Sequence, residues 1–293
     1  MTQPFSHGVV NGADSVTDIV LKAMSRTPDP RLRELMESLV RHLHAFVKET
    51  KPTEEEFEIA VDFLVRLGQA SGPEKNEVIL LSDLLGVSTL VMLLNNARGL
   101  GETDSALLGP FWRAGAPVCD SGDSISRGGQ GGEPLEMRGT VSDTSGKPIA
   151  GATVDVWQAS PVGLYENQDE GQPEHNLRGR FVSDADGRFH FRTVRPAGYP
   201  VPVDGPCGEL LRAQQRHPYR PAHIHFMISK EAFTTLITQV FANDDECIAA
   251  DVVFGVTPPL SGKFEPDGKG GWTLDYKFVM QPGIRRIPKP PIP

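Results

Sequence analysis

The stretch that decides the fold is RPAHIHFMIS, residues 220–229. Its apolar residues Ile224 and Phe226 alternate with His223 and His225. A period of two is the period of a β-strand, in which every second side chain lies on the same face. The pattern therefore predicts a strand with one apolar face turned to a core and with both histidines side by side on the other face.

Short segments rich in β-branched and aromatic residues lie on both sides of this strand, with glycine and proline between them. Many short strands at roughly regular spacing are typical of an antiparallel β-sandwich. Residues 179–184 and 188–194, joined by Ala185-Asp186-Gly187, are expected to form a hairpin. The other expected strands are residues 135–143, 152–159, 236–242 and 272–280.

The first hundred residues follow a helical pattern instead. Residues 31–49 place leucines at three- and four-residue steps, as an amphipathic helix does. The next helix is predicted to begin after Thr53, because Thr53 and Glu56 have the spacing of a capping box. A third and more apolar helical segment, residues 76–95, is expected to pack between other elements. We therefore predict a mixed α and β chain.

The composition changes between these two regions. Glycine, serine and aspartate dominate residues 115–134, which indicates an irregular connection. We accordingly predict a helical domain with its linker over residues 1–114 and a β-sandwich domain over residues 115–293.

Charge and cysteine content restrict the possible partners. The net charge of −9 is spread along the chain, so no basic face favours nucleic acid. The N-terminus lacks a signal-peptide pattern and the apolar runs are too short to span a bilayer, so we expect no membrane insertion. The three cysteines are odd in number and follow no motif spacing, which favours a reducing cytoplasm.

Two histidine pairs with the same spacing must be compared. His42 and His44 lie in the predicted first long helix, where residues two apart point about 200° apart around the axis. They cannot bind one ion together. His223 and His225 share a strand face and could do so. The alternative is that they are hydrogen-bonded core residues, and a zinc site would need a third ligand that no nearby motif supplies.

Two of the four tyrosines lie in loops with unusual composition. Tyr165 is in GLYENQ, residues 163–168, and Tyr199 is in RPAGYPVP, residues 195–202. A phenolate is a hard, anionic ligand, so two phenolates with two imidazoles would favour iron(III) over zinc or copper. Both tyrosines could equally be packing residues with a hydroxyl at the surface.

The chain resembles the intradiol ring-cleaving dioxygenases, the non-haem iron(III) enzymes that open catechols between the two hydroxyls. Three segments carry the resemblance in order and spacing: GLYENQ, then NLRGRFVSDADGRFHFRTVRPAGYPVP (residues 176–202), then HPYRPAHIHFMIS (residues 217–229). The resemblance extends over roughly residues 83–282. It implies a prealbumin-like sandwich as the catalytic domain and a role in the breakdown of aromatic compounds.

Carried over to this sequence, the resemblance implies one iron(III) per subunit, bound by Tyr165, Tyr199, His223 and His225. Tyr199 would be the ligand that leaves when the substrate chelates the metal, taking up a substrate proton. The resemblance places Arg220 near the ring carbon that O2 attacks, and Gln239 beside it as a second polar residue of the pocket. The alternatives are a structural ion pair for Arg220 and a solvent-facing strand position for Gln239.

Within the family, the chain is most similar to the branch that acts on hydroxyquinol (benzene-1,2,4-triol) and forms 3-hydroxy-cis,cis-muconate or maleylacetate. An acidic residue at the position of Asp83 would accept a hydrogen bond from the third hydroxyl, although Asp83 could instead cap a helix. A catechol or chlorocatechol 1,2-dioxygenase is the alternative. By the same resemblance, the pocket walls would be formed by Leu80, Gly109, Pro110 and Val253.

The resemblance also implies a homodimer formed through the N-terminal helices, with a phospholipid at the interface. Two hypotheses from other classes stay open at this point. A non-catalytic sandwich module with a helical dimerisation domain would contain no iron, and a zinc hydrolase would use His223 and His225 alone.

Overall fold

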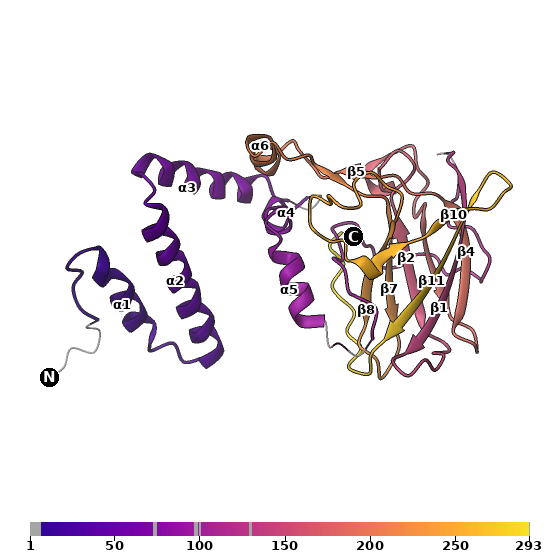
Figure 1. Cartoon of the computed structure of the whole chain (residues 1–293), viewed down its shortest axis with the longest axis horizontal. Helices are drawn as coiled ribbons and strands as arrows, with labels where there is room; N and C mark the ends of the chain where they lie inside the picture. Colours follow the sequence, from indigo (N-terminus) through magenta and orange to yellow (C-terminus); the bar gives the residue numbers. More distant parts are fainter. Residues whose placement is uncertain (1–6, 73–74, 97–98, 100, 129–130, 293) are drawn as a thin grey trace. The chain divides into compact units, whose positions relative to one another are not determined.

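The chain is seen in a computed structural model that describes residues 7–72, 75–96, 99, 101–128 and 131–292 (Figure 1). It divides into two compact units, residues 1–64 and residues 65–293. The functional division expected between residues 114 and 115 is a different one and stays a prediction.

The first unit is helical. It contains α1 (Ala13–Met24), α2 (Pro30–Thr50) and most of α3 (Glu54–Gln69). The predicted capping box of α3 is confirmed, because the Thr53 amide donates to the Glu56 carboxylate at 2.7 Å and the Glu56 amide donates to the Thr53 hydroxyl at 3.2 Å. The histidines of α2 diverge as expected: His42 is exposed, and His44 contacts Thr17 of α1 at 3.1 Å.

The segment expected to be one helix over residues 76–95 is two helices, α4 (Glu77–Leu84) and α5 (Val87–Asn96). Their axes are bent by 75°. Gly86, with a φ of +70°, provides the left-handed conformation at the bend. The expectation that this segment packs between other elements is also wrong, because Leu90 and Leu94 are 58% and 75% exposed. Among the described helices, none alone is long and apolar enough to cross a membrane; α4 and α5 meet that test only as a bent pair.

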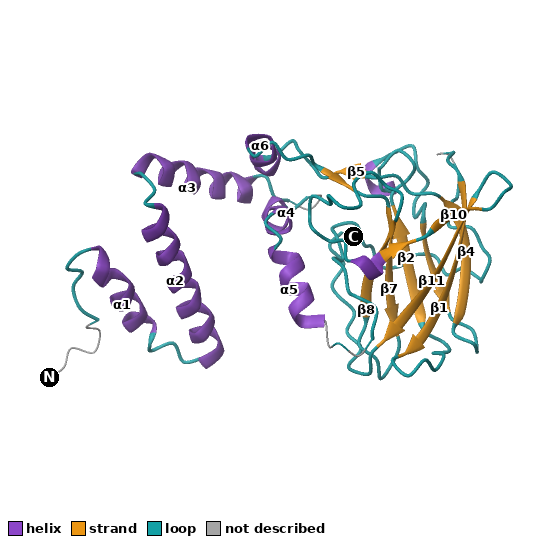
Figure 2. Ribbon diagram, in the orientation of Figure 1, coloured by secondary structure: helices purple, strands orange, loops and turns teal. Residues whose placement is uncertain are grey.

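The second unit contains the predicted sandwich (Figure 2). The first sheet has the order β10-β11-β1-β4, with β1 Pro134–Asp143, β4 Arg188–Val194, β10 Phe264–Pro266 and β11 Trp272–Met280. The second has the order β3-β2-β7-β8-β9, with β2 Thr153–Gln158, β3 Arg178–Val182, β7 His223–Ser229, β8 Leu236–Ala242 and β9 Ser261–Gly262. A small third sheet pairs β5 (Tyr199–Pro200) with β6 (Tyr219–Arg220), and the short helices are η1 (Glu166–Gln168), α6 (Pro206–Ala213) and η2 (Pro258–Leu260). Pairing is antiparallel except between β1 and β11 and between β8 and β9.

The predicted hairpin of β3 and β4 is wrong. The turn itself is tight, since the Gly187 amide donates to the Asp184 carbonyl at 3.0 Å. However, β3 pairs with β2 and β4 pairs with β1, so the turn carries the chain from one sheet to the other. Phe181 and Phe191 explain the crossing, because they stack at 5.2 Å between centroids inside the core, one from each sheet.

The core lies between the two large sheets. Ile224, Phe226 and Ile228 of β7 are fully buried in it, as the alternating pattern predicts. Both histidines of β7 therefore lie on the face of the sheet that points away from this core, and they too are buried. Other segments of the second unit must cover them there.

Candidate metal centre

Strand β7 presents His223 and His225 on one face, and each ring is 1% exposed. The strand is central in its sheet, with β2 on one side and β8 on the other. Its neighbours hold the His225 ring, which stacks on Trp157 of β2 with 4.7 Å between the centroids and 11° between the planes. Trp157 therefore fixes the plane of the His225 ring.

The two loop tyrosines come to the same place from separate segments. Tyr165 directly precedes η1, and Tyr199 begins β5. Main-chain pairing puts Tyr199 opposite Arg220 of β6. The exposed fractions of Tyr165 and Tyr199 are 1% and 8%, so neither is a packing residue with a hydroxyl in water.

Four side-chain atoms converge at this point. Tyr165 Oη lies 3.3 Å from Tyr199 Oη and 3.1 Å from His225 Nε2. His223 Nε2 lies 3.1 Å from His225 Nε2 and 3.5 Å from Tyr199 Oη. The structure thus brings together the four side chains that the sequence singles out as metal ligands.

The chemistry of this set fits a highly charged cation. His223 Nδ1 lies 2.7 Å from the Pro221 carbonyl, which can only accept, so Nδ1 carries the proton and Nε2 presents a lone pair. Burial lowers the pKa of both rings, to about 3 for His223, where the Arg220 charge adds to the effect. Burial also raises the pKa of Tyr165 well above its usual value, so its phenolate form needs a positive partner. Two neutral imidazoles and two phenols suit iron(III).

No group of three or more histidine, cysteine, aspartate or glutamate side chains that could hold a metal occurs within the described part of the chain. The candidate centre differs from such a group because half of its donors are phenols.

Arg220 lies beside the four donors and is 5% exposed. Its Nε and Nη2 each lie 3.1 Å from a different oxygen of Asp251, and its Nη1 lies 3.5 Å from His223 Nε2. Burial opposes ionisation of Asp251, but Arg220 more than offsets this and the pKa of Asp251 is lowered. The ion pair considered as an alternative role thus exists, and it holds the guanidinium next to the candidate centre.

Gln239 is fully buried, so the solvent-facing alternative is wrong. It is paired with His225 across β7 and β8. Its Oε1 accepts from Arg220 Nη2 at 2.9 Å and its Nε2 donates to the Leu107 carbonyl at 2.6 Å. Gln239 therefore orients Arg220 and anchors the segment near Leu107.

Asp83 lies in the last turn of α4 and is partly buried. Burial raises the pKa of its carboxyl, while a hydrogen bond to Ser88 and the charge of Arg220 act in the opposite direction. The carboxylate is thus close enough to Arg220 and Asp251 to interact with both electrostatically. A helix cap would accept from a backbone amide, whereas the partner of Asp83 here is the Ser88 side chain, so the capping alternative stays a prediction.

The other predicted pocket residues differ in their surroundings. Gly109 lies against the centre: a Cβ there would come within 3.3 Å of His225 Cε1, and its φ of +73° also favours glycine. Val253 is buried, and its carbonyl accepts from the Thr89 hydroxyl at 3.0 Å. Leu80 is partly buried and Pro110 is exposed. Their role as pocket walls stays a prediction.

Comparison with known proteins decides the family. A family described as "Catechol dioxygenase N terminus" matches residues 29–103, and one described as "Dioxygenase" matches residues 107–282. The chain belongs to the intradiol dioxygenase family. It is therefore an enzyme, and the hypothesis of a non-catalytic sandwich module is wrong.

Individual intradiol dioxygenases show how similar the chain is. A hydroxyquinol 1,2-dioxygenase from Rhizobium sp. is 45% identical over 90% of this chain and 93% of its own. A catechol 1,2-dioxygenase from Candida albicans is 40% identical over 92% of each chain. The crystal structure of hydroxyquinol 1,2-dioxygenase from Pseudomonas putida superposes with a TM-score of 0.88 at 39% identity, covering 92% of this chain and 99% of that one.

Sequence reasoning missed the charged residues around this intradiol dioxygenase centre. Asp251, Glu166 and Arg178 are all buried in ion pairs within or next to it. A charged residue in a loop or edge strand is normally exposed, and no local pattern distinguishes these three from surface residues. For Glu166, its position directly after Tyr165 was the one available signal.

Proposed function

We propose that this enzyme opens hydroxyquinol between its adjacent hydroxyls with O2 and yields 3-hydroxy-cis,cis-muconate, the enol form of maleylacetate. The observation that carries the proposal is a two-phenol, two-imidazole centre with the Asp83 carboxylate nearby. A carboxylate in that position would accept a hydrogen bond from the third hydroxyl, which catechol lacks. The similarity to proteins named hydroxyquinol 1,2-dioxygenase supports the same substrate.

One iron(III) per subunit would be held by Tyr165, Tyr199, His223 and His225. When bound, the ion would supply a Lewis acid that holds both adjacent oxygens of the substrate. The main support is the donor set itself, since burial lowers the pKa of both imidazoles and raises the pKa of Tyr165, whose phenolate form then needs a cation.

Tyr199 would accept a proton from the substrate at its Oη. Its phenol is at the edge of the centre, 3.5 Å from His223 Nε2, and its strand β5 has two residues. A side chain carried on so short a strand can turn away as the substrate enters. The proton that the substrate hydroxyl loses would then be the proton that Tyr199 Oη gains as its side chain turns away.

Arg220 would stabilise the negative charge that develops on oxygen during ring opening. Asp251 and Gln239 hold its guanidinium in place beforehand, so little reorganisation is needed when the charge appears. Leu80, Gly109, Pro110 and Val253 would shape the space around the substrate ring. At Gly109 the missing side chain keeps the approach to His225 open.

The second candidate is a catechol or chlorocatechol 1,2-dioxygenase. The Ser88 hydroxyl near Asp83 favours it, because a carboxylate that accepts from a protein hydroxyl has one acceptor position fewer for a substrate hydroxyl. A catechol 1,2-dioxygenase is also among the similar proteins, at 40% identity.

Oxygen uptake by the purified, iron-loaded enzyme separates the two candidates. We expect kcat/KM for hydroxyquinol to exceed that for catechol and for 4-chlorocatechol by at least about tenfold, which corresponds to about 1.4 kcal/mol. The product from hydroxyquinol should carry both atoms of ¹⁸O2. A preference for catechol of similar size would contradict the hydroxyquinol assignment and leave the intradiol activity intact.

The N-terminal helices would form a homodimer. Helix α2 exposes an apolar row that nothing in its own unit covers, and large exposed apolar patches mark interfaces. Its members are Leu32, Leu35, Leu39, Leu43 and Phe46, each at least 49% exposed. We propose that a phospholipid chain can lie in this apolar interface and that residues 1–114 serve assembly while residues 115–293 supply the metal ligands.

We place the enzyme in the cytoplasm. Cys119, Cys207 and Cys247 are all free thiols, which fits a reducing compartment.

A further inference from the structure

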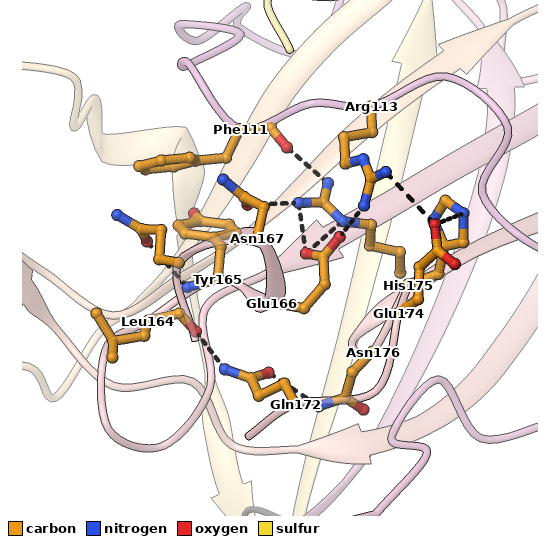
Figure 3. A network of polar contacts seen from close by, with 12 residues as sticks. Phe111, Arg113, Leu164, Tyr165, Glu166, Asn167, Gln172, Glu174, His175 and Asn176 are labelled. Atoms are coloured by element: carbon orange, nitrogen blue, oxygen red, sulfur yellow. Dashed lines mark hydrogen bonds and ion pairs between the residues drawn. The ribbon is translucent and has the colours of Figure 1, made fainter. Parts of the chain in front are cut away.

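The two tyrosines of the centre differ in how they are held. Tyr199 sits on β5, a strand of two residues whose pairing with β6 covers only Tyr199 and Pro200. Tyr165 is the N-cap residue of η1, and its amide donates to the Gln168 side chain at 3.0 Å. A network of polar side chains surrounds that turn (Figure 3).

Arg178 is at the centre of this network and is 1% exposed. Its Nε and Nη2 both lie 2.7 Å from Glu166 Oε2, one residue after Tyr165. Its Nη1 donates to the Phe111 carbonyl at 2.6 Å, and its Nη2 donates to Asn167 Oδ1 at 3.3 Å. One guanidinium thus holds two consecutive residues of η1 together with a separate segment of the chain.

Phe111 connects this network to the Tyr165 ring itself. The two rings stack with 4.4 Å between centroids and 26° between planes. Arg178 therefore constrains Tyr165 in two ways, through the turn that carries its backbone and through the ring that packs on its face. Phe111 also follows Gly109 and Pro110, so the same anchor fixes a predicted wall of the pocket.

Further contacts hold the network in place. Glu166 Oε1 accepts from Arg113 at 2.9 Å, so the carboxylate lies between two guanidinium groups (Figure 3). On the other side of the turn, Gln172 donates to the Leu164 carbonyl at 3.2 Å and accepts from Asn176 at 3.0 Å. Residues 164–167 are thus held from both sides.

We propose that Arg178, acting with Glu166, is a positioning residue that keeps Tyr165 in place at the metal while Tyr199 is free to move. This inference rests on the proposed iron centre and adds the physical origin of the difference between its two tyrosines. A buried arginine can do this because its planar fork binds three acceptors at once in a fixed geometry. Lysine carries the same charge, but its donors all leave one nitrogen and cannot reproduce the contacts that Nε, Nη1 and Nη2 make in different directions.

The test compares iron-loaded Arg178→Lys and Glu166→Gln with the wild type. Visible absorption and resonance Raman spectra report the tyrosinate bound to iron(III), and the rate of iron loss to a chelator reports how firmly the donors are held. We expect a shifted tyrosinate band and iron loss at least about tenfold faster in both variants, since residues that support metal ligands typically change metal affinity 10–100-fold when mutated.

Arg180→Lys is the matched control, because Arg180 lies two residues away on β3 and pairs with Asp155 at 3.0 Å, outside the network. Its spectrum and rate of iron loss should match those of the wild type within about twofold, since its ion pair is partly exposed. A merely structural role for Arg178 would lower the melting temperature without moving the tyrosinate band of the folded protein. If Arg178→Lys does not fold, Glu166→Gln decides the matter by the same readouts.

Folded variants with the spectrum and rate of iron loss of the wild type would overturn the inference. Wild-type protein that shows no tyrosinate band would overturn the proposed iron centre, and the inference with it. A wild type that shows the band without cleaving hydroxyquinol would contradict the proposed substrate alone, while the spectra of the variants would still decide the role of Arg178.

Discussion

At the scale of single residues, the chemistry depends on charges that are buried in pairs. Arg220 has a fixed orientation because two of its nitrogens, Nε and Nη2, donate to the two carboxylate oxygens of Asp251. The Asp251 carboxylate also accepts from the amides of Val253 and Gly255, so it ties Arg220 to the loop that carries a predicted pocket wall. Removal of the Asp251 charge should therefore disturb both the orientation of Arg220 and the loop that contains Val253.

Asp251→Asn is therefore expected to lower kcat at least about tenfold, because the guanidinium that stabilises the developing charge loses its fixed orientation. It should also lower the free energy of unfolding by about 3–5 kcal/mol, because the buried guanidinium loses its counter-ion. Steady-state oxygen uptake and urea unfolding measure the two effects. Glu231→Gln removes a partner of Arg285 that is 80% exposed and should change neither.

Tyr165 offers a more direct test of the centre. Tyr165→Phe removes one of the four converging atoms and keeps the ring that stacks on Phe111. We expect most of the visible tyrosinate band and nearly all ring-cleaving activity to disappear, while the fold and the far-ultraviolet circular dichroism are retained. A variant that keeps the wild-type colour would show that Tyr165 is not a ligand.

The role of Asp83 can be separated from that of a helix cap. If Asp83 binds the third hydroxyl, Asp83→Asn should change the ratio of kcat/KM for hydroxyquinol to that for catechol by about tenfold or more. If it merely joins α4 to α5 through the Ser88 side chain, then Asp83→Asn and Ser88→Ala should both lower stability by about 1 kcal/mol and leave the ratio unchanged. Substrate comparison and thermal unfolding of both variants distinguish these outcomes.

At the scale of elements, the sequence predicted correctly those features that depend on residues close together in the chain. The strand β7 and the capping box of α3 could be predicted, because side-chain period and a three-residue spacing are local features. The crossing from β3 to β4 could not, because it depends on Phe181 and Phe191 entering one core from different sheets. A tight turn looks the same in sequence whether its strands pair or separate.

The same reasoning applies to the candidate site. Its four donors stood out because histidine and tyrosine are few in this chain and occur in unusual contexts. Arg178 and Asp251 did not, since a charge becomes a buried anchor only when a partner from a distant segment meets it. Burial of a charged pair depends on tertiary structure. The residues that support the centre could therefore be identified only once the fold was known.

The bend between α4 and α5 yields a prediction about stability. Gly86 has a φ of +70°, and a Cβ there would meet the Phe254 ring at 3.4 Å. Gly86→Ala should lower stability by about 1 kcal/mol, seen as a fall in Tm of about 2–4 °C. Gly68→Ala, in α3, meets no neighbour within 4 Å and should instead be neutral or slightly stabilising. Equal effects of the two changes would contradict this account of the bend.

At the scale of the whole molecule, the apolar row of α2 determines the expected assembly. Leu39 and Leu43 lie one helical turn apart on that row and are 49% and 52% exposed. Two charges placed there would have to be buried in a dimer without partners, at a cost of several kcal/mol. We expect the wild type to have twice the 31.9 kDa mass of one chain in multi-angle light scattering, and Leu39→Lys/Leu43→Lys to be monomeric.

Lys48→Glu is the control for that change. Lys48 lies about 180° around α2 from Leu39, so the substitution reverses a charge on the opposite, exposed face of the helix. It should leave the mass of the dimer unchanged. Since all four converging donors come from residues 165–225 of one chain, the monomeric variant should keep the tyrosinate band of the wild type. A wild type that is monomeric at micromolar concentration would contradict the dimer, and a monomeric variant that loses the band would show that the centre depends on assembly.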